Sequence, residues 1–328
     1  MKFSSWNGRL QALAWAVAFA ANPAIAIAQS YPQQTIKIII PFAAGGGGDV
    51  VGRAVGEQLS ELVGQPVVIE NVAGAGGTLG TARAAKSPPD GYTLFVGTPS
   101  THGTNVAVYS KLPYDAIKDF EPVGLIASSP LMLISSPQLE ARTAGDLIKL
   151  ARAKPGELAY GSYGTGSINH LAVELLQSLA DIKTNHIPYR GSAPAMTDLI
   201  ANRIQFTIDG PAALSFIRAG TVKLLGVGSA QRWAVFPDAP TIAEGGVPGY
   251  ESLTWFGLFT PAGTPKPIVA YLNGKLNEVL KTSRSRETFA KLGVDPAGGG
   301  PEVLTRTVET EVAKWVKVAT EKNIKIEP

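Results

Sequence analysis

The sequence predicts an α/β protein of two lobes, each with a mainly parallel β-sheet flanked by helices. From residue 36 onward, strands, glycine-rich or polar loops and helices alternate, which is typical of parallel βα units. The alternation starts again near residue 131, and the chain ends in helices. We therefore expect lobe 1 to comprise residues 29–127 and 254–328, and lobe 2 to comprise residues 128–253.

The first βα unit covers residues 36–62. Isoleucines at 36, 38, 39 and 40 form a β-branched run that indicates a buried strand. Four glycines, Gly45 to Gly48, follow it, and Asp49 occupies the expected N-cap of a helix. Backbone N–H groups at such a helix N-terminus favour an anion. The helix has apolar residues at helical spacing, namely Val51, Val55, Leu59 and Leu62.

Further strands and helices follow in the same way. Apolar runs bounded by turn residues predict strands at residues 66–70, 93–98, 123–127, 131–135, 159–162, 204–208, 223–229 and 253–260. Helical patterns lie at residues 81–86, 143–153, 167–179, 211–220, 267–281, 284–292 and 303–322, with a further helix ending at 199. Of these, the helix that starts at Ser167 has the clearest apolar periodicity.

The first 28 residues predict a cleaved secretory signal peptide. Lys2 and Arg9 precede an apolar run at residues 10–21, and Ala26-Ile27-Ala28 offers a small-residue cleavage site. The chain has no cysteine, which excludes disulfides, thiolate metal sites and a lipid-bearing cysteine. Together these features predict the periplasm of a Gram-negative bacterium.

Charge and histidine spacing narrow the function classes. There are 29 basic and 26 acidic residues without a basic stripe, so neither nucleic acid nor a membrane surface is indicated. His102, His170 and His186 have no metal-binding or catalytic-triad spacing. We expect no metal and no cofactor.

The glycine runs do not match nucleotide-binding motifs. A dinucleotide fingerprint needs a glycine where Val50, Val51 or Leu79 stands, and no phosphate-loop lysine follows Gly48. Tyr160 likewise replaces the first glycine of a nucleophile elbow around Ser162. A smaller anion, such as a carboxylate, fits the glycine loop better. A secreted hydrolase centred on Ser162 or Ser167 stays open as an alternative.

Polar residues follow several predicted strands, at the edge where open α/β sheets bind ligands. Hydroxyls and helix-start N–H groups there suit a desolvated carboxylate. Ser167 and Ser192 could also be helix N-caps, which is compatible with binding. The candidate ligand-binding residues are Phe42, Ala43, Ala44, Gly48, Ser100, Thr101, His102, Ser162, Tyr163, Thr165, Gly166, Ser167, Arg190, Ser192 and Asp209.

Several motifs occur in order along the chain: IIIPFAAGGGGDVVGR (38–53), VIENVAGAGGTLGT (68–81), KLPYDAIKDFEPVGLI (111–126), YGSYGTGSINHLAVELL (160–176), IPYRGSAPAMTDLIANRIQFTID (187–209) and TPAGTPKPIV (260–269). Together they resemble the Bug family, the extracytoplasmic solute receptors of tripartite tricarboxylate transporters. The resemblance covers essentially the whole mature chain.

The resemblance implies a two-lobed periplasmic binding protein, not an enzyme, with a ligand cleft between its lobes. It implies carboxylate contacts from residues 42–48 and 162–167, and a cleft also faced by residues 100–102, 188–192 and Asp209. Ala43-Ala44 replaces prolines found in many relatives.

From these features we expect a monomer that captures a small organic carboxylate by hinge closure and delivers it to a tripartite tricarboxylate-type permease. Phe42, His102 and Tyr163 could hold a flat ring, and Arg190 a distal carboxylate. An aromatic, terephthalate-like carboxylate or dicarboxylate is therefore favoured over a C4–C6 di- or tricarboxylate. A sensor subunit is a further alternative, because it would use the same cleft.

Overall fold

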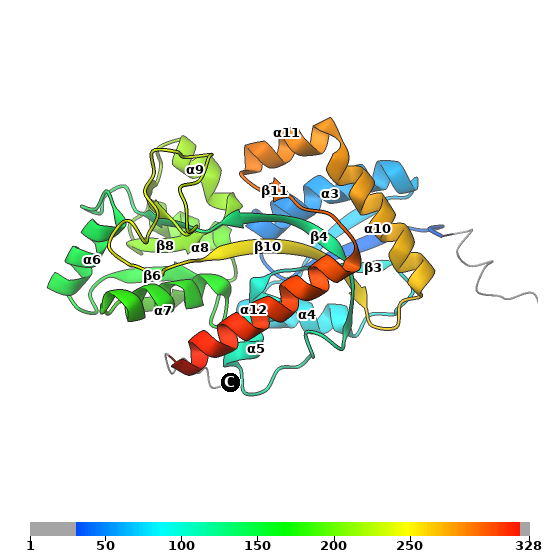
Figure 1. Cartoon of the computed structure of the whole chain (residues 1–328), viewed down its shortest axis with the longest axis horizontal. Helices are drawn as coiled ribbons and strands as arrows, with labels where there is room; N and C mark the ends of the chain where they lie inside the picture. The colour runs from blue at the N-terminus through cyan, green and yellow to red at the C-terminus, as the bar shows by residue number, and fades with distance from the viewer. Residues whose placement is uncertain (1–30, 322–328) are drawn as a thin grey trace, which may run out of the picture. The chain divides into compact units, whose positions relative to one another are not determined.

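Two β-sheets form the framework of the computed structural model, which describes residues 31–321 (Figure 1). The spatial order of the first sheet is β11 (Asp295–Pro296), β4 (Phe120–Pro130), β10 (Leu253–Pro261), β3 (Thr93–Gly97), β1 (Ile36–Ile40) and β2 (Val67–Asn71). That of the second is β7 (Asn185–Pro188), β6 (Ala159–Ser162), β8 (Phe206–Asp209), β5 (Met132–Ser135) and β9 (Lys223–Val227). The predicted signal peptide lies outside the described residues.

Helices flank both sheets. Those of the first sheet are α3 (Gly47–Val63), α4 (Thr78–Ala85), α5 (Asn105–Val108), α10 (Lys266–Lys281), α11 (Ser283–Leu292) and α12 (Pro301–Glu321). Those of the second are α6 (Ala144–Ala153), α7 (Ile168–Ala180), α8 (Ser192–Ile200) and α9 (Leu214–Arg218). Short helical turns lie at η1 (Ala75–Gly77), η2 (Ser100–Thr104) and η3 (Pro211–Ala213). Among residues 31–321, no helix combines the length and apolar character needed to cross a bilayer.

The sheets are mixed, which corrects the expectation that they are mainly parallel. β1 pairs in parallel with β2 and β3, and β6 with β7 and β8. The pairs β3–β10, β10–β4, β4–β11, β8–β5 and β5–β9 are antiparallel. The parallel pairs are joined by crossover helices. In contrast, β4 leads from the first sheet to the second and β10 returns beside it, so these two strands are antiparallel. An apolar run does not encode strand direction.

The opening βα unit folds largely as predicted. The isoleucine strand β1 is buried, and Val51, Val55 and Leu59 of α3 are fully buried behind it. Asp49, however, is not the N-cap. Gly46 takes that position, and Asp49 lies in the first turn of α3. The helix begins earlier than predicted because Gly47 and Gly48 adopt helical backbone conformations.

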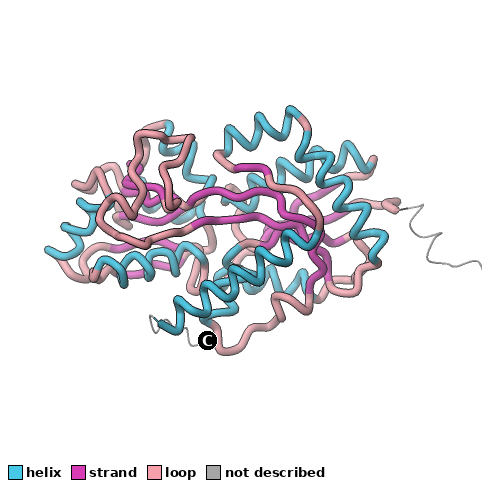
Figure 2. The backbone as a smooth tube through the Cα atoms, in the orientation of Figure 1, coloured by secondary structure: helices cyan, strands magenta, loops and turns pink. Residues whose placement is uncertain are grey.

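Two strands and one helix connect the sheets. β4 and β10 pair over their whole length, and Figure 2 shows them as two adjacent magenta tubes running between the two halves. β4 continues through Ser128, Ser129 and Pro130, where the sequence predicted a break. These residues belong to an extended ribbon, so the predicted lobe boundaries at 127/128 and 253/254 fall within or beside it and stay predictions.

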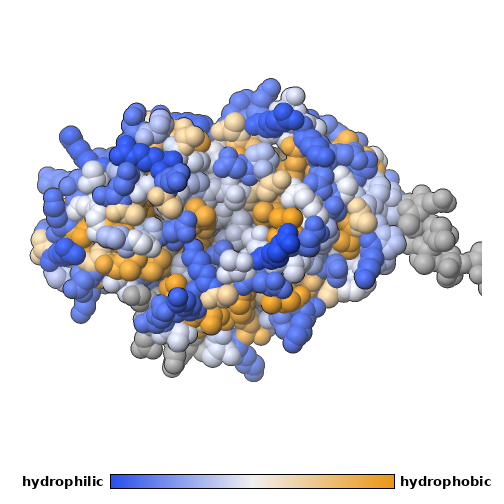
Figure 3. Space-filling view, in the orientation of Figure 1, coloured by the Kyte–Doolittle hydropathy of each residue, from blue (hydrophilic) through white to orange (hydrophobic). Residues whose placement is uncertain are grey.

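Helix α12 packs against both sheets. Its residues Leu304 and Val308 lie in an apolar cluster with Phe259 of the first sheet. Further along, Trp315 and Ala319 lie in the core cluster of the second sheet. On the face drawn in Figure 3, hydrophilic residues surround separate hydrophobic patches, and the side chain of Val316 is 42% exposed. The side of α12 that faces the two sheets is apolar along the helix, because Leu304, Val308, Trp315 and Ala319 all lie in the core clusters.

Candidate binding site

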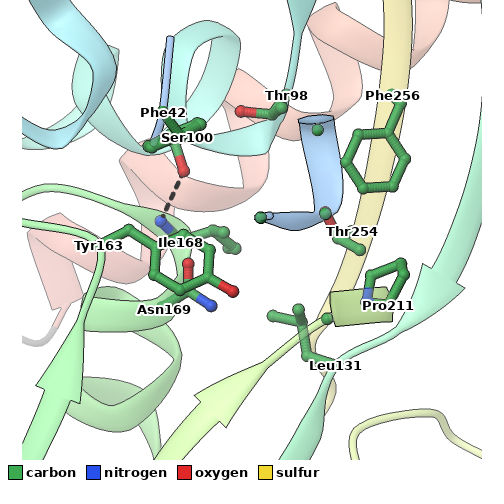
Figure 4. A pocket seen from close by; sticks show the side chains of 14 residues that line it. Phe42, Thr98, Ser100, Leu131, Tyr163, Ile168, Asn169, Pro211, Thr254 and Phe256 are labelled. Atoms are coloured by element: carbon green, nitrogen blue, oxygen red, sulfur yellow. Dashed lines mark hydrogen bonds between the residues drawn. The ribbon is translucent and has the colours of Figure 1, made fainter. Parts of the chain in front are cut away.

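A cavity lies where loops from both sheets meet (Figure 4). Its volume is about 400 Å³, including space open to solvent. The lining residues are Phe42, Gly46, Gly47, Gly48, Thr98, Ser100, Leu131, Tyr163, Ile168, Asn169, Gly210, Pro211, Thr254 and Phe256. None has a formally charged side chain, so hydrogen bonds and helix dipoles must hold any anion bound here.

The first wall is the N-terminus of α3. Gly46 caps this 17-residue helix without a side-chain hydrogen bond. Among the described residues, the N–H groups of Gly47 and Gly48 have no hydrogen-bond acceptor. A Cβ atom on Gly47 would lie 3.2 Å from the Phe256 ring and 3.3 Å from Pro211. Glycine thus lets the helix backbone come close to the cavity and present free donors there.

The Asp49 carboxylate serves the glycine loop instead of facing the cavity. It accepts the Gly45 N–H at 2.9 Å and the Asn71 amide at 3.0 Å, and it pairs with Arg53 at 2.9 Å. Burial opposes its ionisation, but hydrogen bonds from Arg53, Gly45 and Asn71 outweigh this and lower its pKa. Its charge is therefore neutralised locally, and it stabilises the turn that leads into α3.

The second wall is the N-terminus of α7. Ser167 is the N-cap, as predicted, and its hydroxyl accepts the His170 N–H. The next N–H, that of Ile168, donates to Ser100 Oγ at 3.0 Å, the dashed line in Figure 4. Because Ser100 follows β3 and Ile168 follows β6, this bond joins segments of the two sheets. Two helix N-termini therefore face one cavity, which favours negative charge in it.

Two buried polar atoms of the cavity wall have no partner among the described residues: Thr98 Oγ1 and Asn169 Oδ1. Thr98 is 5% exposed and Asn169 is 1% exposed. The other end of the Asn169 amide is tied down, since its Nδ2 donates to the Ile208 carbonyl at 2.7 Å. Buried polar groups are normally satisfied, so these two atoms indicate a site built for a polar ligand.

A buried carboxylate, Asp209, lies behind Tyr163. The Tyr163 hydroxyl and the Ser192 hydroxyl both donate to it, the latter at 2.7 Å, and so does the Gly210 N–H at 2.6 Å. Burial raises the pKa of Asp209 to about 6 despite these bonds. The three donors engage both carboxylate oxygens, so Asp209 positions Tyr163, and it is not among the residues that line the cavity.

His102 does not reach the cavity. It is fully buried and stacks on Phe259 with ring centroids 4.3 Å apart, with Phe120 at 5.0 Å on another side. Its Nδ1 lies 2.8 Å from Thr101 Oγ1, and its Nε2 has no partner among the described residues. The predicted role of His102 in holding a ligand ring is therefore replaced by a role in the aromatic core. Thr101, fully buried beside it, supports the same turn.

Replacing His102 by phenylalanine should reduce the loss of folding stability that occurs when the pH falls from 7 to 5. Burial lowers the pKa of His102 to about 3. That pKa is below the unfolded value of about 6.5. As pH falls below 6.5, His102 therefore becomes protonated in the unfolded chain but stays neutral in the folded chain, which favours unfolding. Between pH 7 and pH 5 this one group should cost about 2 kcal/mol of folding stability. His102→Phe should lose about that much less than the parent in urea titrations at the two pH values; equal losses would contradict the assignment.

Further hydrogen bonds close the contact between loops of the two sheets, at residues that do not line the cavity. The Thr104 hydroxyl donates to the Gly166 carbonyl at 2.6 Å, and the Tyr109 hydroxyl to the Thr165 carbonyl at 2.8 Å. The Ala43 N–H donates to the Arg190 carbonyl at 3.2 Å. These bonds use backbone atoms of four predicted binding residues, namely Thr165, Gly166, Arg190 and Ala43. Ala44 is exposed and does not line the cavity.

Ser162 forms a close pair with His186 but is not placed for catalysis. Its Oγ lies 2.6 Å from His186 Nε2 and also contacts the Gly164 backbone. The serine is fully buried and is not among the residues that line the cavity. His186 stacks on His170, 4.1 Å between centroids, and burial lowers the pKa of both rings. This group fastens β6, β7 and the start of α7 together.

The Arg190 side chain faces a second, more open hollow. Tyr109, Lys111, Thr165 and Tyr189 are among the residues that line it with Arg190. Arg190 and Lys111 are both exposed. The arginine predicted to pair with a distal carboxylate therefore lies outside the closed cavity.

Four predicted residues line the cavity: Phe42, Gly48, Ser100 and Tyr163. The sequence reasoning missed Thr98 and Asn169, the two with unpartnered polar atoms, as well as apolar walls from Leu131, Ile168, Pro211 and Phe256. Thr98 ends the predicted third strand and Asn169 is the second residue after an N-cap, so position at a strand end and a helix start was the available signal. Among the described residues, no three acidic or histidine side chains gather as metal ligands.

The chain is similar to several known receptors. Residues 51–324 match the family described as the tripartite tricarboxylate transporter family receptor. Protein BugT of Bordetella pertussis is 36% identical over 301 residues, which are 91% of this chain and 92% of BugT. An R. palustris protein solved with adipate is 39% identical, with a TM-score of 0.88 over 91% of this chain and 100% of that chain. MatC of Rhodopseudomonas palustris, solved with bound malate, is 35% identical, with a TM-score of 0.85 over 88% of this chain and 99% of MatC.

These similarities span nearly the whole chain, and the proteins matched are binding receptors, not enzymes. The hydrolase alternative is thereby set aside, in agreement with the buried position of Ser162. The chain belongs to the tripartite tricarboxylate transporter receptor family, the Bug family indicated by its motifs, and has the two-lobed fold of periplasmic binding proteins.

Proposed function

We propose that the protein captures a small organic carboxylate in the periplasm and delivers it to a tripartite tricarboxylate-type membrane transporter. In this proposal a leader at residues 1–28 is removed during export, and the mature chain acts as a monomer. The ligand closes the two lobes, 29–127 with 254–328 and 128–253, around itself. One observation carries the proposal: two helix N-termini face a cavity whose lining residues are all uncharged.

The cavity has the balance of features that a carboxylate needs. Unpaired N–H groups at the start of α3 and the dipoles of α3 and α7 stabilise negative charge without a buried counter-ion. Apolar side chains on the remaining walls match a hydrocarbon body. The adipate and malate held by the two structural neighbours are carboxylates of this size class. We extend that ligand class to this chain.

The bonds between loops of the two sheets support closure around the ligand in this proposal. Each side supplies part of the wall and part of the closing bonds, such as Thr104 to Gly166. A ligand that contacts both sides stabilises this arrangement over an open one by its difference in affinity for the two forms. The aromatic preference now rests on Phe42 and Phe256, because His102 belongs to the core.

A thermal-shift panel of mono-, di- and tricarboxylates tests the proposal. Protein freed of co-purified ligand by unfolding, dialysis and refolding should melt at a higher temperature with its carboxylate. At a ligand concentration about a hundredfold above Kd, the stabilisation should be about 2.7 kcal/mol. Matched uncharged amides of the same acids serve as controls and should not act. A panel in which no carboxylate shifts the melting curve would remove the main support for the proposed function.

A further inference from the structure

The amide of Asn169, near the start of α7, is held in one orientation in the cavity wall. The Asn169 side chain is buried, lines the cavity and has its Nδ2 held by the Ile208 carbonyl at 2.7 Å. A flipped amide would place two acceptors, Oδ1 and the Ile208 oxygen, against each other, so the orientation is fixed. Oδ1 has no donor among the described residues. The second wall therefore presents a fixed, unpaired acceptor.

The opposite wall presents donors. The free N–H groups of Gly47 and Gly48 are donors only, and the unpartnered Thr98 hydroxyl can donate as well as accept. A carboxylate satisfies these donors but offers nothing to Asn169 Oδ1, since an ionised carboxylate only accepts. A second carboxylate placed against Oδ1 would be repelled by it. A hydrogen-bond donor on the occupant, besides its carboxylate, would pair this acceptor directly.

The donor is better matched by a hydroxyl than by an ammonium group. None of the lining residues is an acid that could neutralise a buried ammonium. The nearby Asp209 carboxylate is already occupied by Tyr163, Ser192 and Gly210. Apolar neighbours such as Leu131, Ile168 and Pro211 leave little room for further polar groups. A neutral donor meets the acceptor without adding an unpaired charge.

We propose that this cavity selects small hydroxycarboxylates, whose hydroxyl donates to Asn169 Oδ1 while the carboxylate faces the N-terminus of α3. The inference rests on the proposed function and narrows its ligand class. It also assigns Asn169 as a specificity-determining residue. Plain carboxylates bind the same wall of α3 but leave the Asn169 acceptor unpaired.

Matched acids that differ by one hydroxyl test the inference on the ligand-free parent protein. The pairs are butyrate with 3- or 4-hydroxybutyrate, succinate with malate, and benzoate with 4-hydroxybenzoate. By isothermal titration calorimetry we expect at least one hydroxylated acid to bind about tenfold more tightly than its partner, or about 1.4 kcal/mol. If carboxylates bind but no pair favours the hydroxyl, the inference is overturned and the proposed function stands. If no carboxylate binds at all, the proposed function itself fails.

Asn169→Leu should erase the preference by weakening only the hydroxylated acid, to within about threefold of its partner. Asn273→Leu is the matched control. Asn273 lies on α10, donates to the Val123 carbonyl at 2.8 Å and does not line the cavity, so its variant should keep the parent ratio. A preference that survives Asn169→Leu in a folded protein would place the hydroxyl elsewhere and overturn the assignment. Should that variant not fold, the parent's matched pairs still decide the inference.

Discussion

Gly76→Ala is expected to weaken carboxylate binding about a hundredfold, equivalent to about 2.7 kcal/mol. Gly76 lies in η1, beside the loop that follows β6. A Cβ atom there would overlap the Thr165 carbonyl oxygen, which is backbone and cannot turn aside. Reciprocally, a Cβ on Gly164 would lie 2.8 Å from the Gly76 nitrogen. The observed contact between η1 and the loop after β6 thus requires glycine at both positions. A methyl group on Gly76 would push these two segments apart.

Gly220→Ala separates this clash from backbone strain. Gly76 has φ = +62° and Gly220 has φ = +69°, so an alanine at either position meets a similar left-handed penalty of about 1 kcal/mol. No atom lies within 4 Å of a Cβ at Gly220. Both variants should therefore carry a similar strain penalty, but only Gly76→Ala should lose affinity in calorimetric titrations. Parallel losses of affinity in both would show that strain, and not contact, explains the effect.

Trp315→Ala is expected to destabilise the fold by about 4 kcal/mol. Trp315 is fully buried in the core cluster of the second sheet although its helix also covers the first. Its indole N–H donates to Glu311, which also accepts the indole N–H of Trp255 at 3.2 Å. Truncation removes a large apolar surface, leaves a cavity and frees one side of that carboxylate.

Val316→Ala is the matched control on the same helix. Val316 is the next residue and is 42% exposed, so its truncation should change the free energy of unfolding by less than about 0.5 kcal/mol. Equilibrium urea denaturation measures both variants against the parent. Similar small changes for both would mean that α12 contributes little to holding the two sheets together.

Much of the fold could be predicted because the spacing of apolar side chains in the sequence indicates which residues are buried. The isoleucines of β1 and most apolar positions of α3 and α7 are buried as the patterns require, but Leu62 and Leu179, near the C-terminal ends of the two helices, are exposed. The course of β4 through Ser128, Ser129 and Pro130 was missed, because these residues usually interrupt strands but here lie in a paired ribbon. The direction of each strand relative to its neighbours could not be predicted either, since the same residue types occur in parallel and antiparallel pairs.

The candidate site was predictable at the level of loops but not of individual side chains. The turn after β3 contains both Ser100, which lines the cavity, and His102, which points into the aromatic core. The two residues are two positions apart in a single π-helical turn, so their side chains leave it in roughly opposite directions. Asn169 was missed because a helix-start asparagine is usually satisfied, and its unpaired oxygen is evident only in three dimensions.

The ribbon of β4 and β10 also bears on how motion could be observed. Its pairing register shifts between Phe256 and Gly257 and again between Leu258 and Phe259, directly beside a residue that lines the cavity. A bulge bends a strand and increases its local twist, so a small change of angle there is magnified with distance along the ribbon. The chain contains no cysteine, so dyes attached through introduced thiols at Lys111 and Arg190 would have no competing site. The receptor is therefore suited to conversion into an optical sensor of its own ligand.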